Sequence, residues 1–465
     1  MTALPFDNSY ARLPERMFAR MQMQPVAAPR LIVLNEGLAR QIGLDPAVLR
    51  APEGIAWLAG NAAPPGAEPI AAAYAGHQFG VWNPQLGDGR ALLLGELRGP
   101  DGRRRDLQLK GSGPTPWSRG GDGRAWLGPV LREYLMSEAM AALGVPTTRA
   151  LAAVATGEEV AREDTLPGAV LARVAASHIR VGTFQYFAAS GDREALAALT
   201  DHVIARHWPD AGGPAGLLAA VMEAQARLVA RWMAAGFVHG VMNTDNMTVS
   251  GETIDYGPCA FLDGFSRAAV FSSIDRRGRY AYGNQPRIAL WNLAQFATAL
   301  VVLSEDHEAA AAELGRVLEG FAGIYAGAWN TAFAARIGLQ PGAASEALVH
   351  ELLELMEAGG SDFTATFTAL GEGNARDRFA DRAGFDDWAR RWQAAGPDPG
   401  LMRRTNPRVI PRHYLIEAAI AAARAGDFGP FEAMLAAVTN PFAPDAMHER
   451  PPEGGERVTR TFCGT

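Results

Sequence analysis

The apolar and polar positions of this chain follow strand spacing in its first part and helical spacing afterwards. Ala91–Leu97 and Asp106–Lys110 lie between tight turns, and the second run alternates polar and apolar residues. This period of two predicts half-buried strands. A helix is expected over 128–143, and a second strand-like region over 150–174.

Helical periodicity dominates the rest of the chain. Residues 214–235 carry apolar side chains at helical spacing and predict a long amphipathic helix. Strands and one helix therefore come first and a helical mass follows, which predicts a segregated α+β fold with a cleft between two lobes. Further helices are expected over 288–303, 306–335, 344–357, 384–394, 411–425 and 429–438.

These changes in texture divide the chain into four predicted segments. Residues 1–70 mix short helical pieces with Pro-, Gly- and Ala-rich stretches and are interpreted as an N-terminal extension. A smaller β-rich N-lobe is assigned to 71–185, and a larger, mainly helical C-lobe to 186–440. The C-terminal tail spans 441–465, and its last part, 451–465, is polar and expected to be mobile.

The composition is that of an ordinary globular protein, with 48% hydrophobic and 20% charged residues. The net charge of −7 argues against a general nucleic-acid binder, which carries a basic face. The N-terminus lacks the layout of a secretory signal. The apolar stretch Ile288–Leu303 is too short and polar to span a membrane, since it contains Asn292 and Gln295. Because Cys259 and Cys463 cannot form a disulfide framework, a reducing compartment and a cytoplasmic location are expected. Nothing in the sequence suggests an obligate oligomer, so a monomer is expected.

One basic residue differs in kind from all the others. Of the 43 Lys and Arg residues, Lys110 is the single lysine. The richness in Ala, Gly and Arg indicates a bias that replaces lysine wherever arginine serves. A compact ammonium in a tight site cannot be replaced in this way. Lys110 is therefore a candidate functional residue, and chance is the alternative explanation.

The segment 239–257 contains two oxygen-bearing side chains suited to a divalent cation. Ser250-Gly251 fits a two-residue hairpin turn, in which Asn246 would face Asp255. Directly opposed residues have Cβ atoms about 4.5–5.5 Å apart. An amide oxygen and a carboxylate at that distance can share one Mg²⁺. The alternative is an ordinary surface hairpin with polar residues at its base.

The wider arrangement resembles that of a protein kinase. In kinases the loop H-R-D-x-x-x-x-N and the motif D-F-G supply the metal-binding Asn and Asp, and a strand Lys pairs with a helix Glu. Here the segment from His239 to Asn246 has that loop's length, and Asp255-Tyr-Gly257 resembles D-F-G. Lys110 closes a predicted strand, and the following helix carries Glu133 and Glu138, which compete as its partner.

The catalytic base of a kinase is missing from this pattern. Val241 stands where the Asp of H-R-D would be. An ordinary kinase is therefore not expected, which leaves a non-catalytic nucleotide-binding scaffold or sensor, or a different reaction. Asp245 is a carboxylate that could orient or deprotonate a hydroxyl nucleophile, and a role as a loop cap is equally compatible with its position.

Several longer runs carry a more specific resemblance. The chain resembles the selenoprotein O (SelO, or YdiU) family, whose members are protein adenylyltransferases with a kinase-like, two-lobed fold. This resemblance implies transfer of AMP from ATP to Ser, Thr or Tyr hydroxyls of proteins, with ATP flipped relative to kinases; uridylyl transfer from UTP is the alternative. The runs are Asn8–Pro14, Tyr74–Gly80, Gln85–Arg90, Leu109–Pro116, Arg132–Met140, Arg173–Arg180, His239–Asn246, Asp255–Gly257, Ser273–Tyr282 and Asn406–Arg412.

The family's functional residues can be carried over to matching positions. The resemblance makes Asp245 the proton acceptor and Glu133 the partner of the strand lysine. It places Mg²⁺, or possibly Mn²⁺ in its place, on Asn246 and Asp255. The nucleotide contacts that it implies are Gly87, Gly89, Arg90, Lys110, Asp122, Gly123, Arg173, Arg180 and Asp255.

Two further pairs are predicted from position in the chain. Arg173 and Arg180 are seven residues apart, so a helical segment would present both guanidinium groups on one face; the alternative is a pair of surface arginines. Cys259 follows Asp255-Tyr-Gly257, and Cys463 lies where some family members carry a selenocysteine. The two cysteines could form a reversible disulfide at the lip of the site, or remain two thiols.

Overall fold

The computed structural model describes residues 4–462, and its centre is a twisted antiparallel sheet. The strand order is β1-β3-β6-β7-β10-β9-β2, and β8 pairs with β10 beside this path. Two two-stranded sheets, β4 with β5 and β11 with β12, lie apart from it. The strands are β1 (Phe18–Arg20), β2 (Arg30–Leu34), β3 (Ile70–Ala72), β4 (Gly76–Gln78), β5 (Val81–Asn83), β6 (Ala91–Arg98), β7 (Arg104–Lys110), β8 (Ala125–Trp126), β9 (Arg149–Ala161), β10 (Thr165–Ala175), β11 (Phe237–Val238) and β12 (Ala260–Phe261).

The predicted strands are confirmed, and their register places two candidate site residues on one face of the sheet. Lys110 ends β7 and lies opposite Ala91 of β6 on one side and Leu171 of β10 on the other. Arg173 of β10 is directly opposite Gln108. Because side chains alternate along a strand, Gln108 and Lys110 share one face of the sheet. Arg173 therefore reaches the same face as Lys110.

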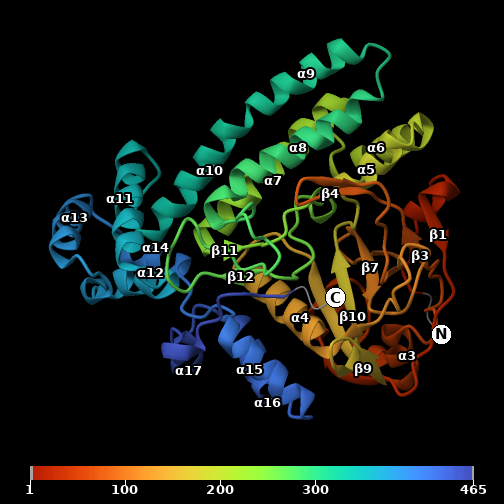
Figure 1. The fold of residues 1–465 in the computed structure, drawn as a ribbon, viewed down its shortest axis with the longest axis horizontal. Helices are drawn as coiled ribbons and strands as arrows, with labels where there is room; N and C mark the ends of the chain where they lie inside the picture. Colours follow the sequence, from red (N-terminus) through yellow and green to blue (C-terminus); the bar gives the residue numbers. More distant parts are fainter. Residues whose placement is uncertain (1–3, 463–465) are drawn as a thin grey trace.

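Helices make up most of the chain after β10. Figure 1 shows the strands of the large sheet, in red to yellow, on one side of α4, and the short strands β11 and β12 with most of the later helices on the other. The helices are α1 (Glu36–Gln41), α2 (Pro46–Arg50), α3 (Pro52–Ala59), α4 (Leu127–Ala142), α5 (Val181–Ala189), α6 (Arg193–His207), α7 (Pro214–Ala235), α8 (Gln285–Val301), α9 (His307–Glu319), α10 (Phe321–Arg336), α11 (Ala343–Gly359), α12 (Phe363–Glu372), α13 (Arg382–Ala394), α14 (Pro399–Thr405), α15 (His413–Arg424), α16 (Gly429–Val438) and α17 (Ala446–Glu449).

Helix α7 has the predicted bounds, with a proline in its first turn and Gly236 at φ 73° as its C-cap. The single helix expected over 306–335 is instead two helices, because the chain breaks at Gly320 between α9 and α10. Helices α5, α6, α12, α14 and α17 were not predicted. No helix within residues 4–462 is both long enough and apolar enough to cross a membrane.

Two hydrophobic cores cover the two faces of the sheet. Residues from α1 and α3, such as Leu38 and Leu58, pack on one face against Leu94 and Leu109. Helix α4 packs on the other face, between the sheet and α15 and α16. Strands β1, β2 and part of β3 come from residues 1–70, so this segment contributes both to the sheet and to a core.

The end of the chain returns to the body of the molecule. Thr461 is buried, its backbone pairs with Ser272, and its hydroxyl donates to the Pro258 carbonyl at 2.6 Å. Arg132 of α4 donates to the Phe462 carbonyl at 3.0 Å. The prediction of a mobile tail is therefore wrong for Thr461, because a specific partner for a polar tail is not visible in its composition.

Candidate active site

A cavity of about 210 Å³ opens where the sheet meets the segment 241–258. Strands β7 and β10 contribute Lys110 and Arg173, and the N-cap of α5 contributes Arg180. The cavity therefore combines groups that are far apart in the sequence. Its lining residues are Tyr74, Gln78, Asp88, Gly89, Arg90, Ala91, Lys110, Arg173, Arg180, Val241, Asn243, Asp245, Asn246, Asp255, Gly257 and Pro258.

Asp255 is the centre of a cluster of ion pairs. Its Oδ1 atom lies 2.7 Å from Lys110 Nζ and 2.6 Å from Arg173 Nη1, and its Oδ2 atom lies 2.5 Å from Arg180 Nη1. Burial alone would raise the pKa of this carboxyl, but the three cations outweigh burial and hold the pKa well below its usual range. Asp255 also adopts a left-handed backbone, φ 60°, which is uncommon for a residue other than glycine and is found at functional sites.

The partner of the lysine is settled by geometry. Lys110 Nζ lies 2.7 Å from Glu133 Oε2, and Arg173 Nη1 lies 3.0 Å from Glu133 Oε1. Glu138, one turn further along α4, instead pairs with Arg149 at 2.6 Å. Glu133 is thus the helix glutamate that pairs with Lys110, and Glu138 ties α4 to β9.

Arg173 and Arg180 do converge, although the predicted reason is wrong. Arg173 lies on strand β10 and Arg180 is the residue before α5, so no helical face carries both. Both guanidinium groups bond to Asp255, and Arg180 also donates to the Asp245 carbonyl at 2.6 Å and lies over the Tyr74 ring. The chain bends between the two arginines, which is why a strand position and a cap position can meet.

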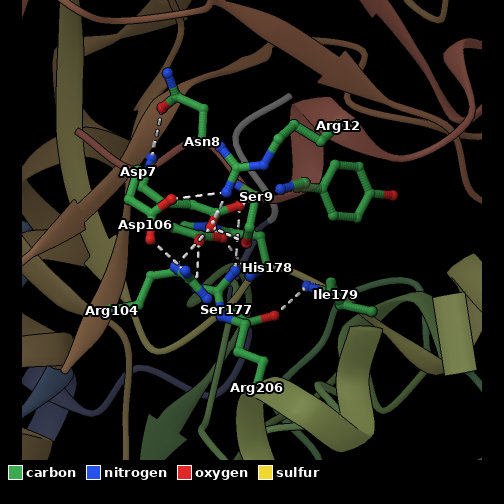
Figure 2. A network of polar contacts seen from close by, with 12 residues as sticks. Asp7, Asn8, Ser9, Arg12, Arg104, Asp106, Ser177, His178, Ile179 and Arg206 are labelled. Carbon is green, nitrogen blue, oxygen red and sulfur yellow. Dashed lines mark hydrogen bonds and ion pairs between the residues drawn. The ribbon is translucent and has the colours of Figure 1, made fainter. Parts of the chain in front are cut away.

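A buried polar network holds this bend. Figure 2 shows Asp106, His178 and Arg206 in contact, together with Arg104 and Asp7. Asp106 accepts a hydrogen bond from the His178 backbone N–H at 2.8 Å, lies 2.9 Å from His178 Nδ1, and pairs with Arg206 at 2.6 Å. The network fixes His178, which lies between the two site arginines in the sequence.

Asp245 has an unusual environment for a carboxylate. It is 7% exposed, its Oδ2 accepts from Gln78 at 3.1 Å, and its Oδ1 has no hydrogen-bond partner within residues 4–462. Burial raises the pKa of Asp245 to about 6, against the lowering effects of Gln78 and Arg180. A carboxyl with this pKa can accept a proton near neutral pH.

The loop around Asp245 is held in place by hydrogen bonds of His239 and Asn246. His239 is fully buried, its Nε2 lies 2.9 Å from the Ile254 carbonyl, and its backbone N–H donates to Gln285 at 3.0 Å. Asn246 donates from its amide nitrogen to the Val241 carbonyl at 2.9 Å. Asn246 is therefore held in place while its amide oxygen has no hydrogen bond among the described residues.

The predicted hairpin between Asn246 and Asp255 is not formed. A turn does occur at Ser250-Gly251, but Thr248 bridges to Arg180 and Thr253 bridges to Thr147. The two arms pair with other parts of the molecule. The Thr248 hydroxyl links them by donating to the Glu252 carbonyl at 2.7 Å and accepting from the Glu252 backbone N–H at 3.0 Å. Asn246 and Asp255 still line the same cavity, but they are not paired with each other in a strand ladder.

Some nucleotide-contact candidates line the cavity and others lie beside it. Gly89 and Arg90 line it, and Gly87 shapes the preceding turn, because a Cβ there would lie 2.2 Å from the Trp117 ring. Asp122 and Gly123 lie in the loop before β8, where Asp122 pairs with Arg162 at 2.8 Å. The structure therefore gathers most, but not all, of the predicted contacts around one space.

Sequence reasoning missed four polar residues of the cavity. They are Tyr74, Gln78, Asp88 and Asn243. Tyr74 and Gln78 belong to a run already noted for its family resemblance, Asp88 lies between Gly87 and Gly89, and Asn243 lies within the loop 239–246. Asn243 accepts from Tyr280 at 2.7 Å and from the Phe79 backbone at 3.1 Å, contacts between distant segments that no local pattern reveals.

The remaining candidates lie around the site. His77 lies 3.0 Å from Gln185, so it contacts α5. Cys259 is fully buried two residues after Gly257, whereas Cys463 lies outside the described residues. The Cys259–Cys463 disulfide therefore stays a prediction.

The donor atoms fit a hard divalent cation. Asp255 and Asn246 both line the cavity and offer a carboxylate and an amide oxygen, and that amide oxygen accepts no hydrogen bond from the described residues. Mg²⁺ and Mn²⁺ favour oxygen ligands of this kind and complete their shells with water or phosphate. Within residues 4–462 there is no cluster of three or more His, Cys, Asp or Glu side chains that could form a metal site.

Comparison with known proteins identifies the chain's relatives. Residues 1–439 match the family described as protein adenylyltransferase SelO. The protein nucleotidyltransferase YdiU of Ruegeria pomeroyi is 58% identical over 472 residues, covering 100% of this chain and 99% of the relative. That of Methylorubrum populi is 57% identical over 498 residues, covering 100% of both chains.

Proposed function

The chain belongs to the protein adenylyltransferase SelO family and is a protein nucleotidyltransferase, and on that premise we propose that it transfers AMP from ATP to Ser, Thr or Tyr hydroxyls of proteins. One observation carries this proposal. Lys110, Arg173 and Arg180 converge beside a carboxyl, Asp245, whose pKa suits proton transfer. Val241 lines the same cavity where a kinase has its base.

The cation cluster would bind the phosphates. In the unliganded protein these three cationic groups form ion pairs with two carboxylates, Asp255 and Glu133. Guanidinium groups match phosphate oxygens well. ATP would draw Lys110 and the two arginines from Asp255 to the polyphosphate. The cavity of about 210 Å³ is smaller than usual small-molecule sites of about 300–1,000 Å³, which is consistent with cations that must move apart.

The freed carboxylate would then hold a metal. Asp255 and Asn246 would bind Mg²⁺ or Mn²⁺, which neutralises phosphate charge and orients the reacting group when bound. Asp255 would thus exchange its ion pairs with protein cations for a bond to the metal. Glu133 keeps its contacts to Lys110 and Arg173 and so keeps both near the phosphates.

Asp245 would act as the proton acceptor. The substrate hydroxyl oxygen attacks the α-phosphorus, the bond to the bridging oxygen of pyrophosphate breaks, and the hydroxyl proton passes to an oxygen of Asp245. Arg180 donates to the Asp245 carbonyl and faces the same cavity, so it can stabilise the negative charge that develops on the phosphate. For this transfer the α-phosphate must face the protein substrate, which corresponds to a flipped ATP in a kinase-like, two-lobed cleft.

Intact-protein mass spectrometry tests the proposal. The protein is incubated with ATP, Mg²⁺ or Mn²⁺ and Ser/Thr/Tyr-containing acceptors, including itself, and UTP competes in a parallel reaction. We expect an AMP adduct that Asp255→Ala abolishes and that Asp386→Ala, a change to a surface ion pair with Arg376, leaves intact. ATP binding without any adduct would show a sensor, a phosphate adduct a kinase, and a preferred UMP adduct a uridylyltransferase.

A further inference from the structure

One buried arginine lacks the partner that all the others have. Five arginines are buried in the described chain, and four of them form ion pairs with carboxylates. Arg336, at the end of α10, is 3% exposed and has no carboxylate within 4.0 Å among residues 4–462. The four paired arginines are Arg132, Arg173, Arg180 and Arg412.

The contacts of Arg336 satisfy only part of its guanidinium. Nε donates to Asn406 at 2.9 Å, Nη1 donates to the Ala234 carbonyl, and Nη2 has no hydrogen-bond partner within the described residues. The group lies over the Phe363 and Phe367 rings. Burial lowers the pKa of Arg336 to about 9, the direction expected for a cation without a counter-charge.

The available compensation is incomplete. Ala234 lies in the last turn of α7, and a helix C-terminus carries about half a negative charge. A buried charge normally needs a full partner, since taking an unpaired ion out of water is strongly unfavourable. Part of the positive charge at Arg336 is therefore unbalanced.

Arg336 lines a cavity whose charged lining residues are all arginines, one of which, Arg227, pairs with Glu223 at 2.7 Å. This cavity has a volume of about 560 Å³ and lies between α7 and α10, which run side by side (Figure 1). Its charged lining residues are Arg227, Arg231 and Arg336, with no acidic residue among the lining. Arg231 donates to the Gly144 carbonyl at 2.7 Å and has no carboxylate partner within residues 4–462. The other lining residues are small or apolar, and Val145 and Phe442 are among them.

We propose that this cavity binds a small organic anion, with its phosphate or carboxylate group between Arg231 and Arg336 and a compact apolar part against the alanine-lined wall. Arginines suit both oxyanions, and the volume falls within the range of small-molecule sites, about 300–1,000 Å³. The site shares no lining residue with the ATP cavity. It is independent of the proposed reaction and would act as an effector or storage site.

Thermal unfolding with inorganic phosphate or acetate, at constant ionic strength in chloride, tests the proposal. Lys110→Met serves as background, because it removes the cation most central to the other cavity. We expect phosphate, acetate or both to raise Tm in a saturable way, and the more effective probe identifies the head group. Arg231→Gln, an exposed position, is expected to raise the apparent Kd at least about 5-fold, equivalent to about 1 kcal/mol.

Two further variants keep the outcome clear. Arg390→Gln, which alters an exposed arginine paired with Asp387, should leave the Kd unchanged. Arg336→Lys keeps the positive charge but loses the planar guanidinium group that can bind two oxygens at once. It is expected to weaken binding as Arg231→Gln does. Neither probe shifting Tm beyond chloride, or a shift that survives Arg231→Gln, would overturn the proposal.

Discussion

Asp255→Asn is the most informative single substitution in the active site. The variant keeps the shape of the side chain, and asparagine tolerates the left-handed backbone at φ 60°. It removes one of the two carboxylates that face Lys110, Arg173 and Arg180. In the unliganded protein Glu133 would keep its ion pairs with Lys110 and Arg173, and Arg180 would lose its ion pair with Asp255.

The size of the effect follows from burial. Removing one partner of a buried ion pair costs about 3–5 kcal/mol, and the lower end applies because the Asp255 side chain is 20% exposed. At about 2.1 cal/mol/K per residue, the unfolding entropy of 465 residues is about 1 kcal/mol/K. The expected fall in Tm is therefore about 3 °C.

Calorimetry with and without a non-transferable ATP analogue measures this effect. With EDTA present, the analogue should stabilise Asp255→Asn more than the wild type, because its phosphates supply the missing negative charge without displacing a carboxylate. Asp386→Asn, in an exposed pair, is the control and should leave Tm unchanged. An unliganded Asp255→Asn protein as stable as the wild type, or equal shifts with the analogue, would refute the reasoning.

Two other predictions concern the neighbouring carboxyl groups. The wild-type kcat is expected to rise with pH through about 6 as Asp245 ionises, whereas Asp245→Asn should be slow with a flat profile. Because the folded pKa of Asp245 is raised from 3.8 to about 6, stability is lost as pH rises through that window. Asp245→Asn should thus gain up to about 3 kcal/mol at pH 7 and nothing below pH of about 4 in urea unfolding. Glu133→Gln should raise the KM for ATP and lower kcat in steady-state assays, while Glu138→Gln should lower only Tm, since Glu138 contacts Arg149 and not Lys110.

The local sequence pattern was enough to predict those strands and helices whose own residues carry a clear periodicity or clear end signals. Strands β6 and β7 alternate, and α7 is bounded by Pro214 and Gly236. Helices α5 and α6 lack such a clear apolar stripe and were missed. Their formation depends on packing against other helices, as α5 packs on α8, and no local period records such contacts.

The candidate site shows the same division. The residue types around Lys110 and Asp255 were predictable from spacing and family resemblance, but their geometry was not. The hairpin failed because Thr248 and Thr253 pair with Arg180 and Thr147, which are distant in sequence. The choice of Glu133 over Glu138 depends on which turn of α4 faces β7, and only the packed structure determines that.

The solitary lysine has a practical consequence. The chain has a single ε-amino group, and it lies in the active-site cavity, held by two carboxylates and only 13% exposed. Any chemistry selective for lysine side chains, whether acylation by a reagent or modification in a cell, can therefore strike only this one amine. The reactivity of Lys110 would therefore report whether the cavity is empty or occupied, and whether the protein is folded.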